Sequence, residues 1–279
     1  MSDRNGKKRK GGGTAVGRAA EILKDSRKLV VKIGSNVLAN ADGHLDRAQI
    51  AEIARQTLAL MADGRQVILV SSGAGAAGAG ATGRLSRRGD ITYKQALCAV
   101  GQVELMMAYR ENFAESGHVV GQLLLTAENF ADETNRLNIR NTLFTLLDEG
   151  VVPIINENDS VSTRELSFGD NDHLAALTAN LWNADLLILM SDVDGVYDCS
   201  PKENANAALI EEVDDIEALR RQISTDGASC FGTGGMESKI AAAEEVGAYS
   251  IPLLLVNGRR PHVLLDVLHG GRSTIFPNN

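Results

Sequence analysis

Residues 29–36, LVVKIGSN, join an unbroken aliphatic run to a lysine, a glycine and two small polar residues. A short apolar run without alternation is typical of a strand that is buried on both faces, as in a parallel sheet. The glycine predicts a tight turn at the carboxyl end of this strand, where the backbone can approach a ligand closely. The stretch therefore indicates an α/β fold with a polar site at the strand end.

The same pattern recurs along the chain. Apolar runs lie at residues 67–70, 119–125, 151–155, 186–190 and 251–256, and helical patterns lie between them at 46–64, 94–115, 132–148, 171–183 and 235–247. This alternation predicts right-handed βαβ units and a mainly parallel twisted sheet covered by helices on both faces, a three-layer αβα sandwich. Residues 161–168 alternate weakly and predict a small hairpin. Ligands of such sheets bind beyond the carboxyl ends of the strands.

The composition excludes several classes of protein. The 279 residues carry a net charge of -8, and residues 1–18 contribute about +5, so the rest of the chain is strongly acidic. An acidic body argues against binding to nucleic acid, and an aromatic content of 4% argues against a base-stacking surface. No apolar run is long enough to span a membrane, and the N-terminus lacks the apolar core of a secretory signal, so we expect a cytoplasmic protein without a membrane partner.

The cysteines and the N-terminal region add two expectations. The three cysteines, Cys98, Cys199 and Cys230, are scattered, which predicts reduced thiols and neither a disulfide framework nor a metal site. Residues 1–26 begin with a basic, glycine-rich run and are expected to form a disordered extension. Residues 27–279 are expected to form the folded domain.

Lysines and glycines at strand ends suggest phosphate binding. Lys32 and Gly34 together offer a positive charge and a close backbone approach, although a lysine at a strand end is also a common solvated surface charge. The stretch 70–78, VSSGAGAAG, leads from a strand into a helix start that favours anions, and close packing of a helix on the sheet explains the same small residues. Residues 232–239, GTGGMESK, are typical of a phosphate cradle that opens a helix or of a flexible loop.

Two clusters of carboxylates and amides lie at 155–160, INENDS, and 169–172, GDND. Such groups can hold a substrate ammonium group or orient lysines, and they also occur in ordinary polar turns. The spacing does not fit an EF-hand calcium loop. The five histidines form no spaced cluster, so none is indicated as a catalytic base or metal ligand.

Taken together and in order, these stretches resemble the amino acid kinase family, and within it most closely the members that phosphorylate glutamate. The resemblance covers about residues 27–260, and its matching segments are VVKIGSNVL, VSSGAGAAG, KQALCAVGQ, GQLLLT, VVPIINENDSV, FGDNDHLAALTA, SDVDGVY and GTGGMESK. It implies ATP-dependent phosphorylation of the γ-carboxylate of L-glutamate, the first step toward proline. It also implies Mg²⁺ as cofactor, a homodimer or homotetramer, feedback inhibition by proline, and lobes at 27–175 for glutamate and 176–279 for nucleotide.

The resemblance also implies roles for individual residues. Lys32 corresponds to the lysine at the transferring phosphoryl group, Lys239 to the second phosphate lysine, and Asp172 to the aspartate that holds both. Residues that bind glutamate are implied to be Ser72, Gly73, Asn156, Asp159 and Asn171. Residues that bind the nucleotide are implied to be Lys32, Gly34, Ser35, Ser191, Asp192, Thr233, Gly234, Gly235, Met236 and Lys239. Mg²⁺ is expected on ATP oxygens and water, without a dedicated set of protein ligands.

This chain departs from the family pattern in three places. Gly75 stands where many members carry a bulkier apolar residue, and Asp198–Lys202 replaces the usual continuation after SDVDGVY. The chain ends at Asn279, so a short form without the PUA domain of many relatives is expected. The alternatives are another family member, acting on aspartate, N-acetylglutamate or a nucleoside monophosphate, and a non-catalytic nucleotide-binding protein on the same fold.

Overall fold

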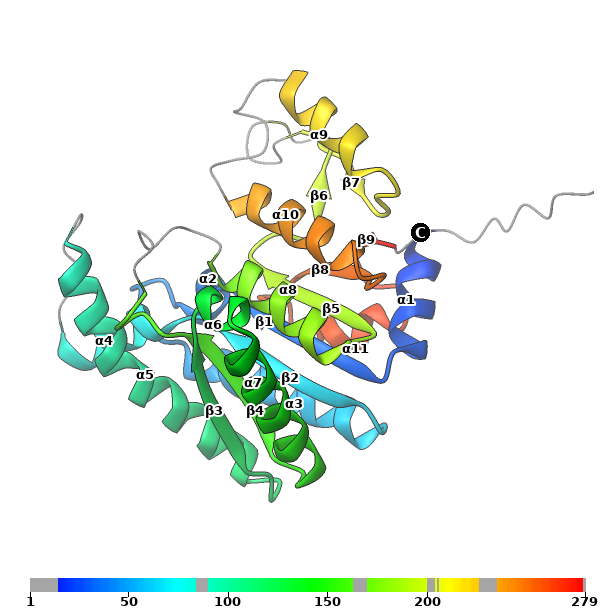
Figure 1. Cartoon of the computed structure of the whole chain (residues 1–279). Coiled ribbons are helices and arrows are strands. Elements are labelled where there is room, and N and C mark those ends of the chain that lie inside the picture. The colour runs from blue at the N-terminus through cyan, green and yellow to red at the C-terminus, as the bar shows by residue number, and fades with distance from the viewer. Residues whose placement is uncertain are drawn as a thin grey trace, which may run out of the picture.

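The computed structural model describes residues 15–83, 90–162, 170–199, 204, 206–225 and 235–277. Its centre is a seven-stranded sheet with the spatial order β3-β4-β2-β1-β5-β8-β9 (Figure 1). The strands are β1 (Lys28–Ile33), β2 (Gln66–Ser71), β3 (Val120–Leu125), β4 (Val152–Glu157), β5 (Leu186–Ser191), β8 (Leu253–Asn257) and β9 (Thr274–Phe276). Neighbouring strands are parallel except for β8 and β9, so the predicted mainly parallel sheet is confirmed.

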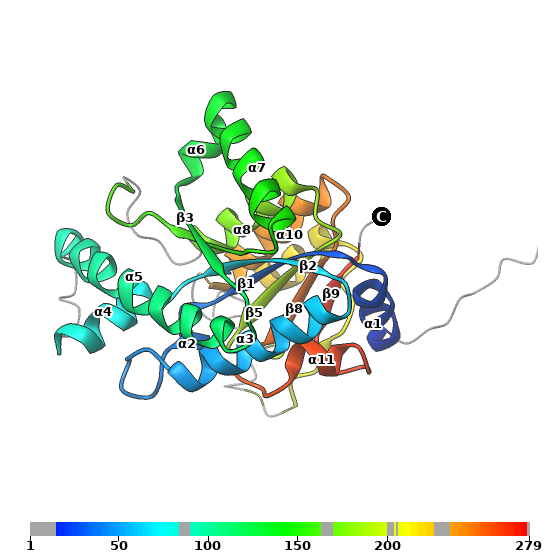
Figure 2. The ribbon, with the colours of Figure 1, turned by 90° about the horizontal axis from the view of Figure 1, so that it is seen from below.

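Helices cover both faces of the sheet, as Figure 2 shows from below. One layer contains α1 (Ala15–Asp25), α2 (Ser35–Leu38), α3 (Arg47–Ala62), α4 (Ala74–Thr82), α5 (Ile91–Ala114) and α11 (Val263–Val267). The other contains α6 (Ala127–Ala131), α7 (Glu133–Asp148), α8 (Asp170–Trp182), α9 (Ile216–Thr225) and α10 (Gly235–Gly247). A small antiparallel pair, β6 (Val196–Tyr197) and β7 (Leu209–Ile210), follows β5 in the chain. The three-layer αβα sandwich is thus confirmed.

The alternation of side chains along β1 sets the direction of the site. Leu29, Val31 and Ile33 belong to the core beneath α3 and α5, whereas Val30 belongs to the core beneath α8 and α10. Successive side chains of a strand point to opposite faces. Lys32 therefore points toward the layer that contains α8 and α10.

Helix α1 corrects the prediction that residues 1–26 form a disordered extension. Residues 15–25 are helical, and Ala19 and Leu23, one turn apart, are buried in the same core as β1. The basic, glycine-rich run before them obscured this short apolar stripe in the sequence. Residues 1–14 lie outside the described part of the chain.

Several helix boundaries follow from local chemistry. Asp46 caps α3 by accepting a hydrogen bond from the backbone N–H of Gln49, and Gly64 ends that segment with a φ of 81°. Most of the predicted hairpin at 161–168 lies outside the described residues. Among those that are described, no helix has both the length and the apolar character needed to cross a membrane.

The central position of β1 in the sheet determines where the site lies. β1 pairs with β2 on one side and with β5 on the other, and Lys32 lies level with Val70 and Leu189. The carboxyl ends of these parallel strands meet at one edge of the sheet. This edge is where a doubly wound sheet binds its ligands.

Candidate active site

A buried cluster of two lysines and one aspartate lies at this edge. Lys32 comes from the end of β1, Asp172 from the first turn of α8, and Lys239 from the first turns of α10. The Nζ of Lys32 is 2.7 Å from Asp172 Oδ1, and the Nζ of Lys239 is 3.3 Å from Asp172 Oδ2. One carboxylate thus holds both ammonium groups, as the resemblance implied.

Burial sets the electrostatics of this cluster. Only 7% of Lys32 and 1% of Asp172 are exposed. Burial lowers the pKa of Lys32 from its usual 10.5, and the charge of Asp172 partly opposes this shift. Burial alone would raise the pKa of Asp172, but the charges of Lys32 and Lys239 hold that pKa below its usual 3.8. Asp172 is therefore ionised at neutral pH and anchors both lysines.

The start of α10 holds Lys239 and Asp172 in place. The Nζ of Lys239 donates to the Gly235 carbonyl at 2.8 Å. The Ser238 hydroxyl lies 2.8 Å from Asp172 Oδ2, to which it donates, and 3.0 Å from the Gly235 carbonyl. The contact between Ser238 and Asp172 was not predicted, because sequence separation hides the approach of α10 to α8.

A neutral network of amides lies beside the charged cluster. Asn171 Nδ2 donates to Ser72 Oγ at 2.8 Å, to Asn156 Oδ1 at 3.0 Å and to the Ser71 carbonyl at 3.2 Å. The structure therefore brings together Ser72, Asn156 and Asn171, which lie on three different segments. Asn171 Oδ1 is buried and has no hydrogen-bond partner among the described residues.

Two glycines shape the backbone here for different reasons. Gly73 begins α4 in the left-handed region, with a φ of 99°, which L side chains rarely adopt. Gly34 has an ordinary φ of -72°, but a Cβ there would lie 3.2 Å from the Met190 carbonyl and 3.7 Å from Lys32 Nζ. Gly34 is thus required by space beside Lys32 and Gly73 by conformation.

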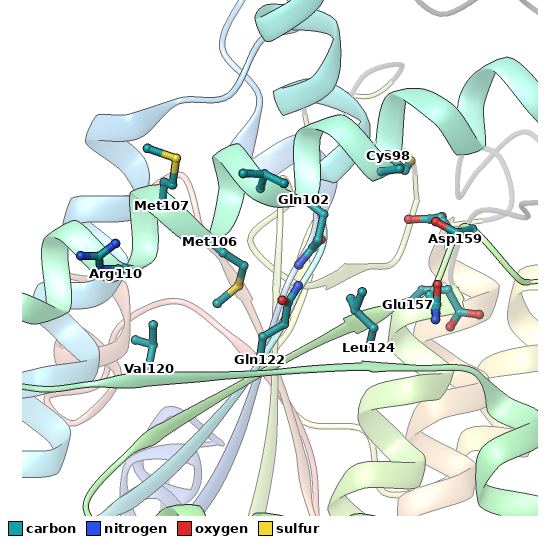
Figure 3. A pocket seen from close by; sticks show the side chains of 14 residues that line it. Cys98, Gln102, Met106, Met107, Arg110, Val120, Gln122, Leu124, Glu157 and Asp159 are labelled. Atoms are coloured by element: carbon teal, nitrogen blue, oxygen red, sulfur yellow. The ribbon is translucent and has the colours of Figure 1, made fainter.

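Asp159 lies on the segment after β4, next to α5. It lines a cavity of about 550 Å³ between α5, β3 and this segment (Figure 3). The thiol of Cys98 on α5 is hydrogen-bonded to Asp159, and burial with this nearby charge raises the pKa of Cys98 to about 12. Cys98 therefore stays a thiol and can only donate to the carboxylate.

The proposed nucleotide side lies at the end of β5. Asp192 accepts hydrogen bonds from Asn36 Nδ2 at 3.0 Å and from Ser191 Oγ at 3.2 Å. Burial by itself would raise the pKa of Asp192, but these hydrogen bonds hold it below 3.8. The side chain of Ser35 is exposed at the start of α2.

The glycine-rich loop before α10 is described only in part. Gly235 supplies its carbonyl to Lys239, and Met236 packs against the core of the second layer. Thr233 and Gly234 lie outside the described residues. Within the described ranges, no group of three or more His, Cys, Asp or Glu side chains is arranged to hold a metal ion.

This arrangement can bind an anion next to a hydrogen-bond donor. The two ammonium groups face one carboxylate and leave positive charge at the strand ends. The amide network beside them offers a buried acceptor, Asn171 Oδ1. Sequence reasoning missed Asn36 and Gln102 and did not predict the contact of Ser238 with Asp172. Gln102 lies in the KQALCAVGQ segment, which supported the resemblance but had been given no role.

Comparison with known proteins agrees with this geometry. The sequence model of the amino acid kinase family matches residues 27–257. Glutamate 5-kinase from Alkaliphilus oremlandii is 51% identical over 257 residues, covering 92% of this chain and 98% of that protein. Glutamate 5-kinase from Geobacter metallireducens is 47% identical over 256 residues, covering 91% of this chain and 69% of that protein.

Among solved structures, UMP kinase from Bacillus anthracis has a TM-score of 0.63 at 17% identity and covers 91% of this chain and 97% of that protein. At this identity the likeness shows the fold alone. The two glutamate 5-kinases are far more similar and match almost the whole of the folded part. The chain therefore belongs to the amino acid kinase family and, within it, to the glutamate 5-kinases.

Proposed function

We infer that this chain transfers the γ-phosphoryl group of ATP to the γ-carboxylate of L-glutamate, which commits glutamate to proline synthesis. The observation that carries the inference is that Asp172 forms ion pairs with both Lys32 and Lys239, next to the amide network of Asn171. The high identity to glutamate 5-kinases supports glutamate as the acceptor.

The chemistry needs no general base. A glutamate side chain has an ordinary pKa of about 4.3, so its carboxylate is already an anion at neutral pH. A carboxylate oxygen attacks the γ-phosphorus, the new O–P bond forms, and the bond from this phosphorus to the bridging oxygen breaks. ADP leaves with that electron pair, and the product is an acyl phosphate.

The obstacle is the approach of one anion to another, which positioning and positive charge overcome. We assign Lys32 to the oxygens of the transferring phosphoryl group and Lys239 to the nucleotide side. Asp172 stays ionised because both lysines hold its pKa low, so it fixes their geometry and takes no proton.

The backbone at Gly34 leaves room for a phosphate group of ATP beside Lys32. Gly34 has no Cβ, and a Cβ there would lie 3.7 Å from Lys32 Nζ, so a phosphate oxygen can approach the backbone closely beside this lysine. Mg²⁺ would neutralise charge on the phosphates, held mainly by their oxygens and water. Ser191 and Asp192 at the end of β5 are the protein groups that we assign to the nucleotide side, with Ser35 and residues 233–236.

We assign the amide network to glutamate. Ser72, Gly73, Asn156, Asp159 and Asn171 are proposed to bind it. The acceptor lobe would then be residues 27–175 and the nucleotide lobe residues 176–279, with the transferring group between Lys32 and Lys239. A homodimer or homotetramer, feedback inhibition by proline and a cytoplasmic location remain proposals that rest on likeness to the family.

A coupled assay for ADP release tests the function. Purified protein is given ATP and Mg²⁺ with glutamate, aspartate, N-acetylglutamate or UMP, and the acyl phosphate is trapped with hydroxylamine. Turnover with glutamate well above the other acceptors is expected. Turnover with another acceptor and none with glutamate would overturn the assignment, and ATP binding without any turnover would favour a non-catalytic protein.

A further inference from the structure

The inner face of α5 contacts the end of β4 and the segment that follows it at three points. Gln95 Nε2 donates to the Ser162 carbonyl at 3.4 Å, the Cys98 thiol is hydrogen-bonded to Asp159, and Gln102 Oε1 accepts from Asn156 Nδ2 at 2.8 Å. Positions 95, 98 and 102 are three and four residues apart and so lie on one face of a helix. This face of α5 therefore packs along residues 156–162, which include two of the residues that we assign to the acceptor.

The polarity of the amide network can be deduced from one backbone group. The N–H of Glu157 can only donate, and it donates to Asn156 Oδ1 at 2.9 Å. The Nδ2 of Asn156 must then point away from this bond, toward Gln102, and only an oxygen of Gln102 can accept from it. Asn156 Oδ1 is left to accept from Asn171 Nδ2.

Asn171 ends the chain of hydrogen bonds. Its Nδ2 has two hydrogens and three oxygen neighbours, so its donors are fully used. Its Oδ1 is buried without a partner among the described residues and is therefore available to accept from a ligand. In glutamate, the only N–H donors belong to the α-ammonium group.

Resting on the proposed function, we propose that Gln102 is a positioning residue that makes the site selective for an acceptor with an ammonium group. It accepts from Asn156, which fixes Asn171 with its Oδ1 presented to the ligand. Without that acceptor, the Asn156 amide loses one of its anchors and Asn171 is held less firmly. Gln102 is not a catalytic residue, because it acts through Asn156.

The surroundings of Gln102 are consistent with a role in the site. Asn156 is 2% exposed, so its amide cannot replace Gln102 with bulk water. Gln102 and Asp159 line the same cavity, and in Figure 3 the side chain of Gln102 points from α5 into it, toward Gln122 of β3. The face of α5 that carries Gln95, Cys98 and Gln102 thus contacts Asn156 and Asp159, two residues that we assign to glutamate.

The test compares glutamate with glutarate, which is the same diacid without the ammonium group. In the Gln102→Met variant, the KM for glutamate should rise about 10-fold, as expected for losing one buried hydrogen bond in a network. The Ki of glutarate as a competitive inhibitor, the KM for ATP and kcat should each change by less than about twofold. Glu111→Met, which places the same side chain at an exposed position of α5 outside this cavity, is the matched control and should change none of them.

An equal loss of affinity for glutamate and glutarate would overturn the proposal, because a merely structural role weakens both. Gln102→Glu keeps the acceptor and the length of the side chain, so it must keep at least the original preference for glutamate; a loss of that preference would also overturn the proposal, even if Gln102→Met fails to fold. In an Asn171→Ala background, Gln102→Met should add little further effect. Failure of the unmodified protein to turn over glutamate would overturn the proposed function itself, whereas an active protein without these differences would exclude only the role of Gln102.

Discussion

The two halves of the site are built from opposite kinds of chemistry. The phosphoryl half is a buried ion cluster in which Asp172 holds Lys32 and Lys239. The acceptor half contains a neutral network in which Asn171 and Asn156 connect to β2 and α5 through amide hydrogen bonds. A buried charge is costly without its partner, whereas a neutral amide that loses one hydrogen bond costs far less.

This difference predicts which property of the protein a single substitution in each half should affect. Each member of the ion cluster is needed by the other two, so single substitutions there should act on both stability and turnover. The amide network is attached to β2, Ser72, the backbone of β4 and α5 by one hydrogen bond each, so single substitutions there should act mainly on acceptor binding. The predictions below test that contrast.

Asp172→Asn should have the largest effect. It leaves two lysines close together in a buried site without their carboxylate, and losing one partner of a buried pair costs about 3–5 kcal/mol of unfolding free energy. Turnover should fall by about 10³-fold or more, because the lysines lose both their geometry and their charge. Denaturant unfolding and steady-state kinetics measure the two effects.

Asp185→Asn is the matched control. Asp185 accepts hydrogen bonds from the backbone N–H groups of Arg27 and Lys28, each at 2.8 Å, at the amino end of β1. Its loss should reduce stability modestly and leave kcat unchanged. Normal turnover of the Asp172→Asn variant would show that the ion cluster is structural only.

Lys32→Ala should have the next largest effect. Its loss removes one positive charge from the transferring phosphoryl group, and kcat should fall by about 10²–10³-fold, or about 3–4 kcal/mol in the barrier. The KM for glutamate should change little, because the amide network is intact. Lys239→Ala should behave similarly.

Lys28→Ala is the control on the same strand. Lys28 begins β1 and donates to the Trp182 carbonyl at 2.6 Å, at the opposite end of the sheet from the site. This variant should lose some stability and keep its kcat. If the KM for glutamate rose as strongly as kcat fell in Lys32→Ala, the two halves of the site would not be separable.

The pH dependence should separate the two halves in another way. Burial lowers the pKa of Lys32 below 10.5, so its charge, and with it kcat, should be lost on the alkaline side earlier than for an ordinary lysine. A lowered folded pKa means that the charged form of Lys32 destabilises the fold, and this destabilisation disappears as the pH rises from the folded pKa toward 10.5. Deprotonation of Lys32 should therefore not unfold the protein, and the fall in kcat reports the loss of its charge. The measurement is kcat at saturating glutamate and ATP across pH, with unfolding followed in parallel.

The acid side follows Asp172. Its folded pKa is lowered, so its stabilising contribution is complete above 3.8 and is lost as the pH falls through the folded pKa. No general base titrates in the proposed mechanism, so kcat should be flat through neutral pH. An acid limb in kcat near pH 6–7, where a histidine ordinarily titrates, would contradict a mechanism without a base.

The fold could be predicted from the sequence because its signals are local. The aliphatic runs of the central strands and the caps such as Asp46 are sufficient to place the helices and strands around β1. Helix α1 was missed because its buried stripe, which includes Ala19 and Leu23, is short and follows a basic, glycine-rich run. The short elements β6, β7 and β9 carry too few residues for a periodic signal.

The site could be predicted only in part. The resemblance identified Lys32, Asp172 and Lys239, and the structure brings them into contact. The roles of Gln102 and Ser238 depend on which helix faces pack together, and no pattern in a single sequence contains that information. Residues such as Thr233 have a predicted role that the described part of the chain does not test.

The smallest effect should come from Gly75→Ala, in the acceptor half. A Cβ at Gly75 would lie 3.6 Å from Cys98 Sγ, an ordinary contact, and Gly75 lies within α4. Alanine should therefore raise the unfolding free energy by about 0.5–1 kcal/mol through its better helix propensity and leave the KM for glutamate within about twofold.

Gly34→Ala is the matched change in the phosphoryl half, where the new methyl group meets the Met190 carbonyl at 3.2 Å and takes the space beside Lys32. Because Gly34 already has an ordinary φ, a fall in kcat in that variant would report lost space and not backbone strain. Equal tolerance of both substitutions would show that the site does not need the space beside Gly34.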